Sequence, residues 1–269
     1  MITAQVRLVA TDLDGTLLRS DGTVGSRTRA ALAAIAARGG QHIVVTGRSV
    51  AWTRPVLAGL GYTGLAVCGQ GGQVYDAGAH RELTSYVLDR NVARQALTTI
   101  AAVTGPLSLA ADQAGLDGAV LVGPGYRPDP LDSLPVVPVG AQRLWATPVR
   151  KFYVQHPELD EDRLYEVASR LAGHLVTITK AGPGEIEILP LGLSKADGLA
   201  YAAGRLGLCG ADTIAFGDMP NDVSMLAWAG YGVAMANAHP ELKAVADEVA
   251  PGNDDEGVAV VLDRILRTR

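Results

Sequence analysis

The order of hydrophobic and polar positions divides the chain into three stretches. In the first, short apolar runs alternate with segments whose apolar residues recur every three or four positions. The runs 6–10, 43–45 and 65–68 are typical of strands buried on both faces of a parallel sheet. Between them, 25–38 and 49–57 have helical spacing. This alternation predicts right-handed crossovers, with helices on both faces of the sheet.

A different pattern begins at about residue 73. From 73 to 86 the apolar residues are scattered among polar ones, as in antiparallel hairpins. The segment 123–148 is rich in proline and glycine and predicts an irregular connection. Helices are expected at 89–103 and 159–171, and strands at 107–111, 119–122, 151–155, 174–179 and 185–189. Such α+β patterning predicts a second module, inserted after the third strand.

The first pattern resumes after Pro190. Strands are expected at 213–216 and 232–235, and helices at 195–206, 222–229, 240–246 and 257–267. The predicted fold class is therefore α/β: a doubly wound, Rossmann-like parallel-sheet core with an inserted α+β domain.

Composition narrows the class of protein without naming a function. The chain has 269 residues, 48% of them hydrophobic, which is enough for a sizeable core in one large or two modest domains. A formal net charge of −5 gives no electrostatic reason to expect nucleic acid or an anionic membrane as a partner. No apolar stretch approaches the roughly 20 residues that span a bilayer, and no signal-peptide layout opens the chain. Cys68 and Cys209 are expected to be buried free thiols, which suits a cytoplasmic protein.

Candidate chemistry is concentrated where apolar runs end. Asp12 and Asp14 follow the first run and precede Gly15, which permits a sharp turn. Asp12 is a candidate nucleophile, because a carboxylate can attack phosphorus and divide one displacement into two easier ones. Asp14 is placed to protonate the leaving oxygen and later to deprotonate water. Taken alone, two acids with this spacing also occur in solvated turns.

The attack of one anion on another requires a cation. Mg²⁺ is the natural candidate, because it prefers hard oxygen ligands. Asp12 and Asp218 can supply carboxylates, and Asp14 its backbone carbonyl. Ligands of open α/β sheets bind beyond the carboxyl ends of the strands, so Asp12, Thr46 and Asp218 are expected to line one crevice.

Four residues are candidates for binding the phosphoryl oxygens. Thr46 offers a hydroxyl and, with Gly47, backbone amides near a helix start. Lys195 offers an ammonium and Asn221 an amide hydrogen, while Asp222 can orient Lys195 or a metal-bound water. Each also has an ordinary explanation, as a strand-end turn, a solvated lysine or a capped loop. Their occurrence together, in this order, favours phosphoryl transfer.

At these residues the chain resembles the haloacid dehalogenase superfamily of phosphatases, specifically the Cof-type group with a large C2-type cap. The similarity extends over nearly the whole chain. Asp12-Leu13-Asp14-Gly15-Thr16 looks like the first family motif, Thr46-Gly47-Arg48 like the second, Lys195 like the third, and Gly217-Asp218-Met219-Pro220-Asn221-Asp222 like the fourth.

The resemblance implies a role for each of these positions. Asp12 would be the nucleophile and Asp14 the acid–base, with Mg²⁺ held by Asp12, the Asp14 carbonyl and Asp218. The residues implied to bind or support the phosphate are Leu13 (amide), Thr46, Gly47, Lys195 and Asn221, with Arg48 and Asp222 in support. The resemblance also implies a catalytic core of 1–81 and 188–269 and a substrate-specificity cap of 82–187, which opens and closes on hinges near Gly78 and Gly184.

The sequence departs from the family pattern in places. Relatives often have asparagine-glycine where this chain has Gln70-Gly71, and glycine where Ala196 follows the lysine. Both departures are expected to affect substrate choice more than chemistry. The acidic run 253–256 is expected to be a solvated helix start, where negative charge suits the helix dipole.

These observations predict a Mg²⁺-dependent phosphomonoester hydrolase that acts on a small phosphorylated metabolite, a sugar phosphate or similar, through an aspartyl-phosphate. Two alternatives stay open at this point: a phosphomutase of the same architecture, and a non-enzymatic metabolite-binding protein. Oligomeric state is not predicted. The candidates for substrate selection in the cap are Arg127, Arg143, Lys151, Tyr153 and Glu185.

Overall fold

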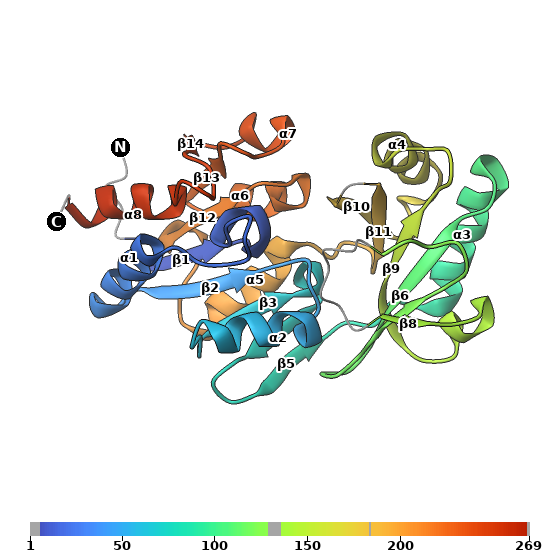
Figure 1. Cartoon of the computed structure of the whole chain (residues 1–269), viewed down its shortest axis with the longest axis horizontal. Helices are drawn as coiled ribbons and strands as arrows, with labels where there is room; N and C mark the ends of the chain where they lie inside the picture. The colour runs from blue at the N-terminus through green and yellow to red at the C-terminus, as the bar shows by residue number, and fades with distance from the viewer. Residues whose placement is uncertain (1–5, 129–135, 183, 268–269) are drawn as a thin grey trace. The chain divides into compact units, whose positions relative to one another are not determined.

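The computed structural model describes residues 6–128, 136–182 and 184–267. These residues form two compact units, whose elements are labelled in Figure 1. The first unit consists of 6–47, Leu57–Leu83 and 194–267, and the second of Arg48–Val56 and Thr84–Leu193. The assignment of 82–187 as a cap remains a prediction.

An eight-stranded sheet forms the centre of the first unit, in the order β14-β13-β12-β1-β2-β3-β4-β5. Its strands are β1 (Leu8–Thr11), β2 (Gln41–Val45), β3 (Leu65–Cys68), β4 (Gln73–Asp76), β5 (Arg81–Ser85), β12 (Thr213–Gly217), β13 (Tyr231–Met235) and β14 (Glu248–Ala250). Strands β14 to β3 are parallel, whereas β4 runs antiparallel to β3. The chain builds the sheet outward from β1 in both directions, which makes the end of β1 a topological switch point.

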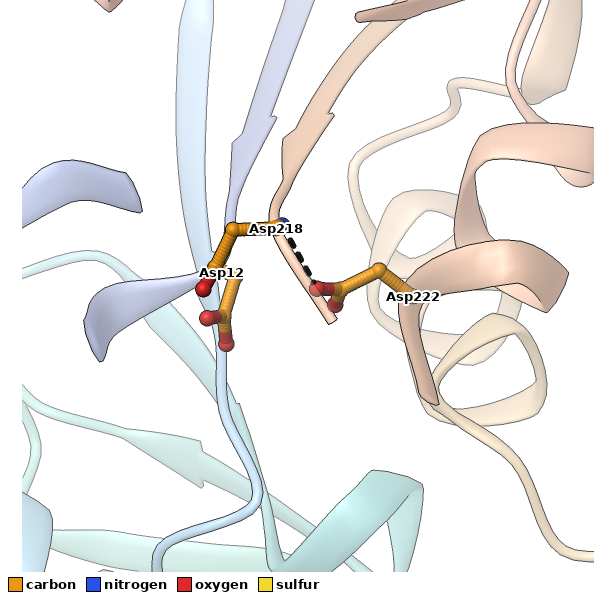
Figure 2. Close-up of side chains that lie close together, drawn as sticks. All are labelled: Asp12, Asp218 and Asp222. Carbon is orange, nitrogen blue, oxygen red and sulfur yellow. Dashed lines mark hydrogen bonds between the residues drawn. The ribbon is translucent and has the colours of Figure 1, made fainter. Parts of the chain in front are cut away.

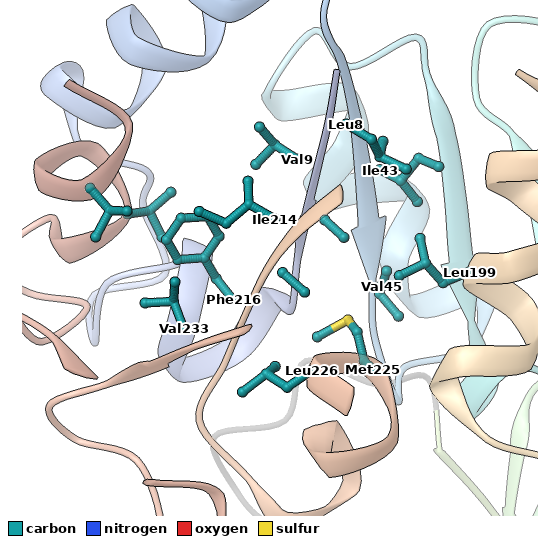
Figure 3. Close-up of a cluster of buried hydrophobic side chains, with 14 of the residues drawn as sticks. Leu8, Val9, Ile43, Val45, Leu199, Ile214, Phe216, Met225, Leu226 and Val233 are labelled. Carbon is teal, nitrogen blue, oxygen red and sulfur yellow. The ribbon is translucent and has the colours of Figure 1, made fainter. Parts of the chain in front are cut away.

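The helices of this unit bury apolar faces against the sheet. They are α1 (Ser26–Ala37), α2 (Val50–Gly59, shared between the units), α5 (Lys195–Arg205), α6 (Val223–Trp228), α7 (Pro240–Lys243) and α8 (Gly257–Arg267). Helix α1 packs against α8, and α5 packs against α6 and β3. Figure 3 shows the result in the core, where Val9 and Phe216 lie on one side of the sheet and Ile43 and Val45 on the other, near Leu199 of α5. Alternation along each strand puts neighbouring residues on opposite faces.

The second unit contains a six-stranded sheet in the order β10-β11-β9-β6-β7-β8. The strands are β6 (Ser108–Gln113), β7 (Val120–Val122), β8 (Val136–Pro138), β9 (Val149–Gln155), β10 (Thr177–Gly182) and β11 (Glu185–Leu189). Its helices, α3 (Arg90–Thr104) and α4 (Glu161–Ala172), each begin at an aspartate. The side chains of Asp89 and Asp160 accept backbone N–H groups of the first turn, which stabilises the helix start.

The predicted α/β class, with its parallel Rossmann-like core, is confirmed. Strands β8 and β14 were not anticipated, because three-residue strands carry too little periodicity to detect. Part of the predicted irregular connection, 129–135, lies outside the described residues. The prediction of two buried thiols is wrong for Cys209, which is exposed, whereas Cys68 is buried. In the described ranges no helix has the length and apolar character needed to cross a membrane.

Candidate active site

The candidate residues gather at the carboxyl ends of three adjacent strands. Strand β1 lies between β2 and β12, with Thr11 in register with Val44 on one side and Phe216 on the other. The residues that follow these strands therefore emerge at one edge of the sheet. Asp12 stays attached to the neighbouring strand, since its N–H donates to the Phe216 carbonyl at 2.9 Å. Asp12, Thr46 and Asp218 are brought to one place by this register.

A wide turn, Leu13–Leu17, follows Asp12. It closes with a hydrogen bond from the Leu18 N–H to the Leu13 carbonyl, 2.8 Å long. Gly15 has a φ of +69°, and a Cβ at this position would overlap the Asp218 carboxylate. Glycine is therefore required twice over, by the backbone conformation and by the close approach of an acid. The Asp14 side chain, one residue earlier, is exposed.

Three carboxylates and one ammonium are buried together at this edge. Lys195 Nζ lies 2.8 Å from Asp12 Oδ1 and 2.6 Å from Asp222 Oδ1. Lys195 is 2% exposed, Asp12 5%, Asp218 8% and Asp222 fully buried. Figure 2 shows the three aspartates, with the hydrogen bond from the Asp218 backbone N–H to Asp222. The cluster holds more negative than positive charge.

Burial and the excess of negative charge shift the pKa values of the ionisable side chains in this cluster. Burial raises the pKa of Asp12 well above its ordinary value; Lys195 opposes this shift, and the Asp222 and Asp218 carboxylates add to it. Burial and then Asp222 raise the pKa of Asp218 to about 7. For Lys195, burial alone would lower the pKa, but Asp12 and Asp222 more than offset it, and the pKa is raised. Buried negative charge in excess of positive charge is the cause of these raised carboxyl pKa values.

The donor set fits a hard divalent cation. Candidate ligand oxygens of Asp12, Asp218 and Asp222 all lie within 4.8 Å of one another. Asp222 is already engaged: Oδ1 accepts from Lys195, and Oδ2 accepts the N–H groups of Asp218 and Met219 at 3.0 and 3.1 Å. Asp12 and Asp218 are thus the better pair for an ion, with Asp222 as the group that orients Lys195. Oxygen donors alone suit Mg²⁺.

The residues expected to bind phosphate lie on both sides of this cluster. Thr46 is buried after β2, and its N–H donates to the Val67 carbonyl at 2.8 Å, so this N–H is engaged within the sheet. Asn221 Nδ2 donates to Gln70 Oε1 at 3.1 Å. The buried Asn221 Oδ1 has no hydrogen-bond partner among the described residues. Buried polar atoms without partners are uncommon and point to a missing ligand.

Lys195 reaches the site because α5 approaches the turn Gly69–Gly71 very closely. A Cβ on Gly71 would collide with the Ser194 carbonyl, and one on Gly198 would lie 2.7 Å from the Gly71 Cα. Both positions must therefore be glycine for the first turn of α5 to sit there. The glycine that helps to place the lysine is Gly198, three residues beyond it.

Several contacts that hold the turn Leu13–Leu17, called the acidic turn below, were not predicted from sequence. Thr16 Oγ1 donates to Asp218 Oδ1 at 2.8 Å, and Asn237 Nδ2 donates to the Gly15 carbonyl at 2.8 Å. The threonine stands inside the first family-like segment, and its position there was the available signal. Asn237 is more than 200 residues from Gly15 in sequence, so only the folded chain brings the two together.

The segment 253–256 directly precedes helix α8 (Gly257–Arg267) with Asp254 and Asp255 exposed, as expected, but some of its side chains also have partners near the N-terminal end of the chain. Asn253 Nδ2 donates to the Leu18 carbonyl at 2.9 Å, and Asp254 accepts the N–H and hydroxyl of Ser20. Glu256 accepts from Arg19 at 2.6 Å and from the Thr28 N–H at 2.8 Å. Asn253, Asp254 and Glu256 thus bind residues that follow the turn Leu13–Leu17. The two carboxylates take part in packing this segment as well as standing before a helix.

The remaining candidates belong to the second unit. Arg48, predicted to support the phosphate, has its guanidinium 4.3 Å from the centre of the Trp52 ring. Lys151 pairs with Glu187 and lies 4.5 Å from the centre of the Tyr153 ring. Glu185 accepts from the Tyr126 hydroxyl, Arg127 exchanges hydrogen bonds with Gln155, and Arg143 is exposed. The roles predicted for them stay predictions.

Comparisons with known proteins agree with this geometry. The model of the haloacid dehalogenase-like hydrolase family matches residues 9–262. The HMP-PP phosphatase of Serratia proteamaculans is 30% identical over 264 residues, which cover 97% of this chain and 96% of that protein. The 5-amino-6-(5-phospho-D-ribitylamino)uracil phosphatase YwtE of Bacillus subtilis is 27% identical, with 97% and 98% covered.

Solved structures show the same fold over nearly the whole chain. A haloacid dehalogenase-like hydrolase from Bacteroides thetaiotaomicron has a TM-score of 0.76 at 27% identity, covering 96% of this chain and 99% of its own. The subclass IIB sugar phosphatase BT4131 has a TM-score of 0.81 at 19% identity, covering 96% and 98%. At that identity the second likeness concerns the fold alone.

Proposed function

This chain belongs to the haloacid dehalogenase-like hydrolase family, and we propose that it is a Mg²⁺-dependent phosphomonoester hydrolase working through an aspartyl-phosphate. The family and its phosphatase members establish the class of enzyme; the metal and the intermediate are our proposal. The observation that carries the proposal is the buried cluster in which Asp12, Asp218 and Asp222 outnumber Lys195.

Asp12 is the proposed nucleophile. Its carboxylate attacks phosphorus, the bond to the ester oxygen breaks, and an acyl-phosphate forms on Asp12. Lys195 holds this carboxylate in place and is itself held by Asp222, so the ammonium stays charged beside the transferring group. The Leu13 amide, Thr46, Gly47 and Asn221 are proposed to bind the phosphoryl oxygens.

Asp14 is the proposed acid and base. Its side chain is exposed, on the turn next to Asp12, where it can protonate the departing alcohol. The resulting carboxylate then takes a proton from water, which attacks phosphorus, releases inorganic phosphate and regenerates Asp12. Mg²⁺, held by Asp12, Asp218 and the Asp14 carbonyl, would supply positive charge that offsets the repulsion between phosphate and carboxylate.

The proposed substrate is a small phosphorylated metabolite, a sugar phosphate or similar. The named relatives act on HMP-PP and on 5-amino-6-(5-phospho-D-ribitylamino)uracil, and both compounds belong in a first screen. The second unit is proposed to select the substrate. Phosphate release from about a hundred phosphorylated metabolites would identify the preferred leaving group.

The test of the chemistry is hydrolysis of p-nitrophenyl phosphate. We expect turnover with Mg²⁺, little after chelation, and a loss of at least about 10³-fold in kcat for Asp12→Asn, because the nucleophile is removed. Asp117→Asn is the matched control, since it makes the same change at an exposed carboxylate. Undiminished turnover in Asp12→Asn would refute the nucleophile. A hexose phosphate tests the alternative, since transfer of its phosphoryl group to a second sugar hydroxyl, without release of inorganic phosphate, would indicate a phosphomutase.

A further inference from the structure

Gln70 has a backbone conformation that its residue type disfavours. Its φ is +59° and ψ 30°, between Gly69 and Gly71, which also have positive φ. Among the described residues other than glycine, only His80 and Glu256 share this property, and Gln70 is the most buried of them at 2% exposed. Residues with a Cβ persist in such conformations where the surroundings require them, often at functional sites.

The side chain of Gln70 lies between two parts of the phosphate site. The Oε1 atom of Gln70 accepts from Asn221 Nδ2 at 3.1 Å, and the backbone N–H of Gln70 donates to the Thr46 carbonyl at 3.2 Å. A Cβ added to Gly47 would stand 2.5 Å from Gln70 Nε2, so the amide is packed against that glycine. One residue thus touches Thr46, Gly47 and Asn221.

We propose that Gln70 is a positioning residue of the phosphate site, which fixes the orientation of Asn221 and packs against the turn at Gly47. The inference rests on the proposed function. Because Gln70 presents a carbonyl oxygen, a reversed Asn221 amide would place two acceptors together. Asn221 Oδ1 is therefore directed away from Gln70 as a buried acceptor without a partner, ready for a donor such as water in the phosphate complex. The left-handed backbone of Gln70 places this amide beside Asn221.

Two substitutions relieve the backbone strain while removing or shortening the amide. Gln70→Gly relieves the strain and removes the amide, whereas Gln70→Asn keeps an amide on a residue that tolerates positive φ but shortens it by one methylene. For both we expect kcat/KM for p-nitrophenyl phosphate to fall about tenfold, and the inhibition constant of inorganic phosphate to rise by a similar factor. The midpoint of thermal unfolding should stay within about 3 °C of wild type, because relief of strain offsets the lost hydrogen bond.

His80→Gly is the matched control. It relieves the same conformation at an exposed turn of the first unit, so the kinetic constants should not change. Gly47→Ala provides a second readout. Alone it should lower kcat/KM strongly, because the new Cβ collides with the Gln70 amide. Combined with Gln70→Gly, which removes the colliding amide, it should have a kcat/KM at least about threefold higher than Gly47→Ala alone. This rescue tests the contact between the two positions, and the inhibition constant of inorganic phosphate tests the positioning role.

The outcomes distinguish the two proposals. If both Gln70 variants hydrolyse p-nitrophenyl phosphate as the wild type does, and their inhibition constants for phosphate lie within twofold of the wild-type value, the positioning role is overturned. The proposed function is unaffected by that result. A fall of more than about 5 °C in the unfolding midpoint that accompanies the loss of activity also overturns the positioning role. A wild-type protein that neither hydrolyses p-nitrophenyl phosphate nor binds inorganic phosphate with Mg²⁺ overturns the proposed function, and the role of Gln70 with it.

Discussion

The two units bury charge in different ways. In the second, Arg150 donates to both oxygens of Asp112, at 2.9 and 3.2 Å, and Lys151 pairs with Glu187. All four side chains are at most 3% exposed, and in each pair a cation lies against a carboxylate. In the first unit, one buried lysine faces three buried aspartates.

This difference in charge balance distinguishes buried ion pairs that serve the fold from a buried cluster suited to binding a ligand. A balanced buried pair compensates its own desolvation, and its main effect is that neither partner can be removed alone. An unbalanced cluster leaves negative charge without compensation, which is why burial and neighbouring carboxylates raise the pKa values of Asp12 and Asp218. Such a cluster costs stability in the metal-free chain, and a bound cation removes that cost. The excess of negative charge, more than burial itself, distinguishes the candidate active site from the buried pairs of the second unit.

The largest effect on stability is expected from breaking a balanced pair. Asp112→Asn leaves the buried Arg150 without its anion and should lower the free energy of unfolding by about 3–5 kcal/mol. Asp117→Asn, at an exposed pair, should produce no measurable change. Asp12→Asn should not destabilise the metal-free protein, because it removes part of the excess charge. Urea unfolding followed by circular dichroism measures all three; equal losses in Asp112→Asn and Asp12→Asn would contradict the comparison.

A smaller effect is expected from metal. Mg²⁺ at a hundred times its dissociation constant should stabilise the wild type by about 2.7 kcal/mol, since it binds the folded chain alone. Asp218→Asn should remove most of this gain, whereas Glu187→Gln should leave it intact despite lowering stability. Thermal unfolding across a Mg²⁺ titration measures the gain. Equal stabilisation of Asp218→Asn and wild type would place the ion elsewhere.

A third effect is a dependence on pH in the metal-free protein. Burial, and then Asp222, raise the pKa of Asp218 from 3.8 to about 7, so the folded state holds this proton more tightly than the unfolded chain. Its contribution to stability is fully present below about pH 4, decreases as the pH rises, and is lost above about 7. Unfolding measured with a chelator from pH 4 to 8 should therefore show a steeper decline for wild type than for Asp218→Asn. Identical slopes would mean that Asp218 ionises normally.

Much of the fold follows from local pattern. Buried strands such as 43–45 and amphipathic helices such as 159–171 were predictable because their periods of apolar residues differ. The short edge strand β14 was missed because three residues do not establish a period. Asp12, Lys195 and Asp218 were recognisable because each stands beside an apolar run or a helix start. Gln70 was noticed only as a departure from a family pattern, since neither its positive φ nor its contact with Asn221 is written in local sequence.

Local sequence determined which elements form and which chemical groups stand at their ends, because both depend on residues a few positions apart. The folded chain alone decided that Lys195 lies between Asp12 and Asp222, that Asn237 and Asn253 bind the turn after β1, and that the exposed Asp254 binds Ser20. These contacts join segments up to about 235 residues apart, and they arise from strand order and register in the central sheet. The charge balance at the site depends on several distant segments coming together, so it cannot be read from any one of them.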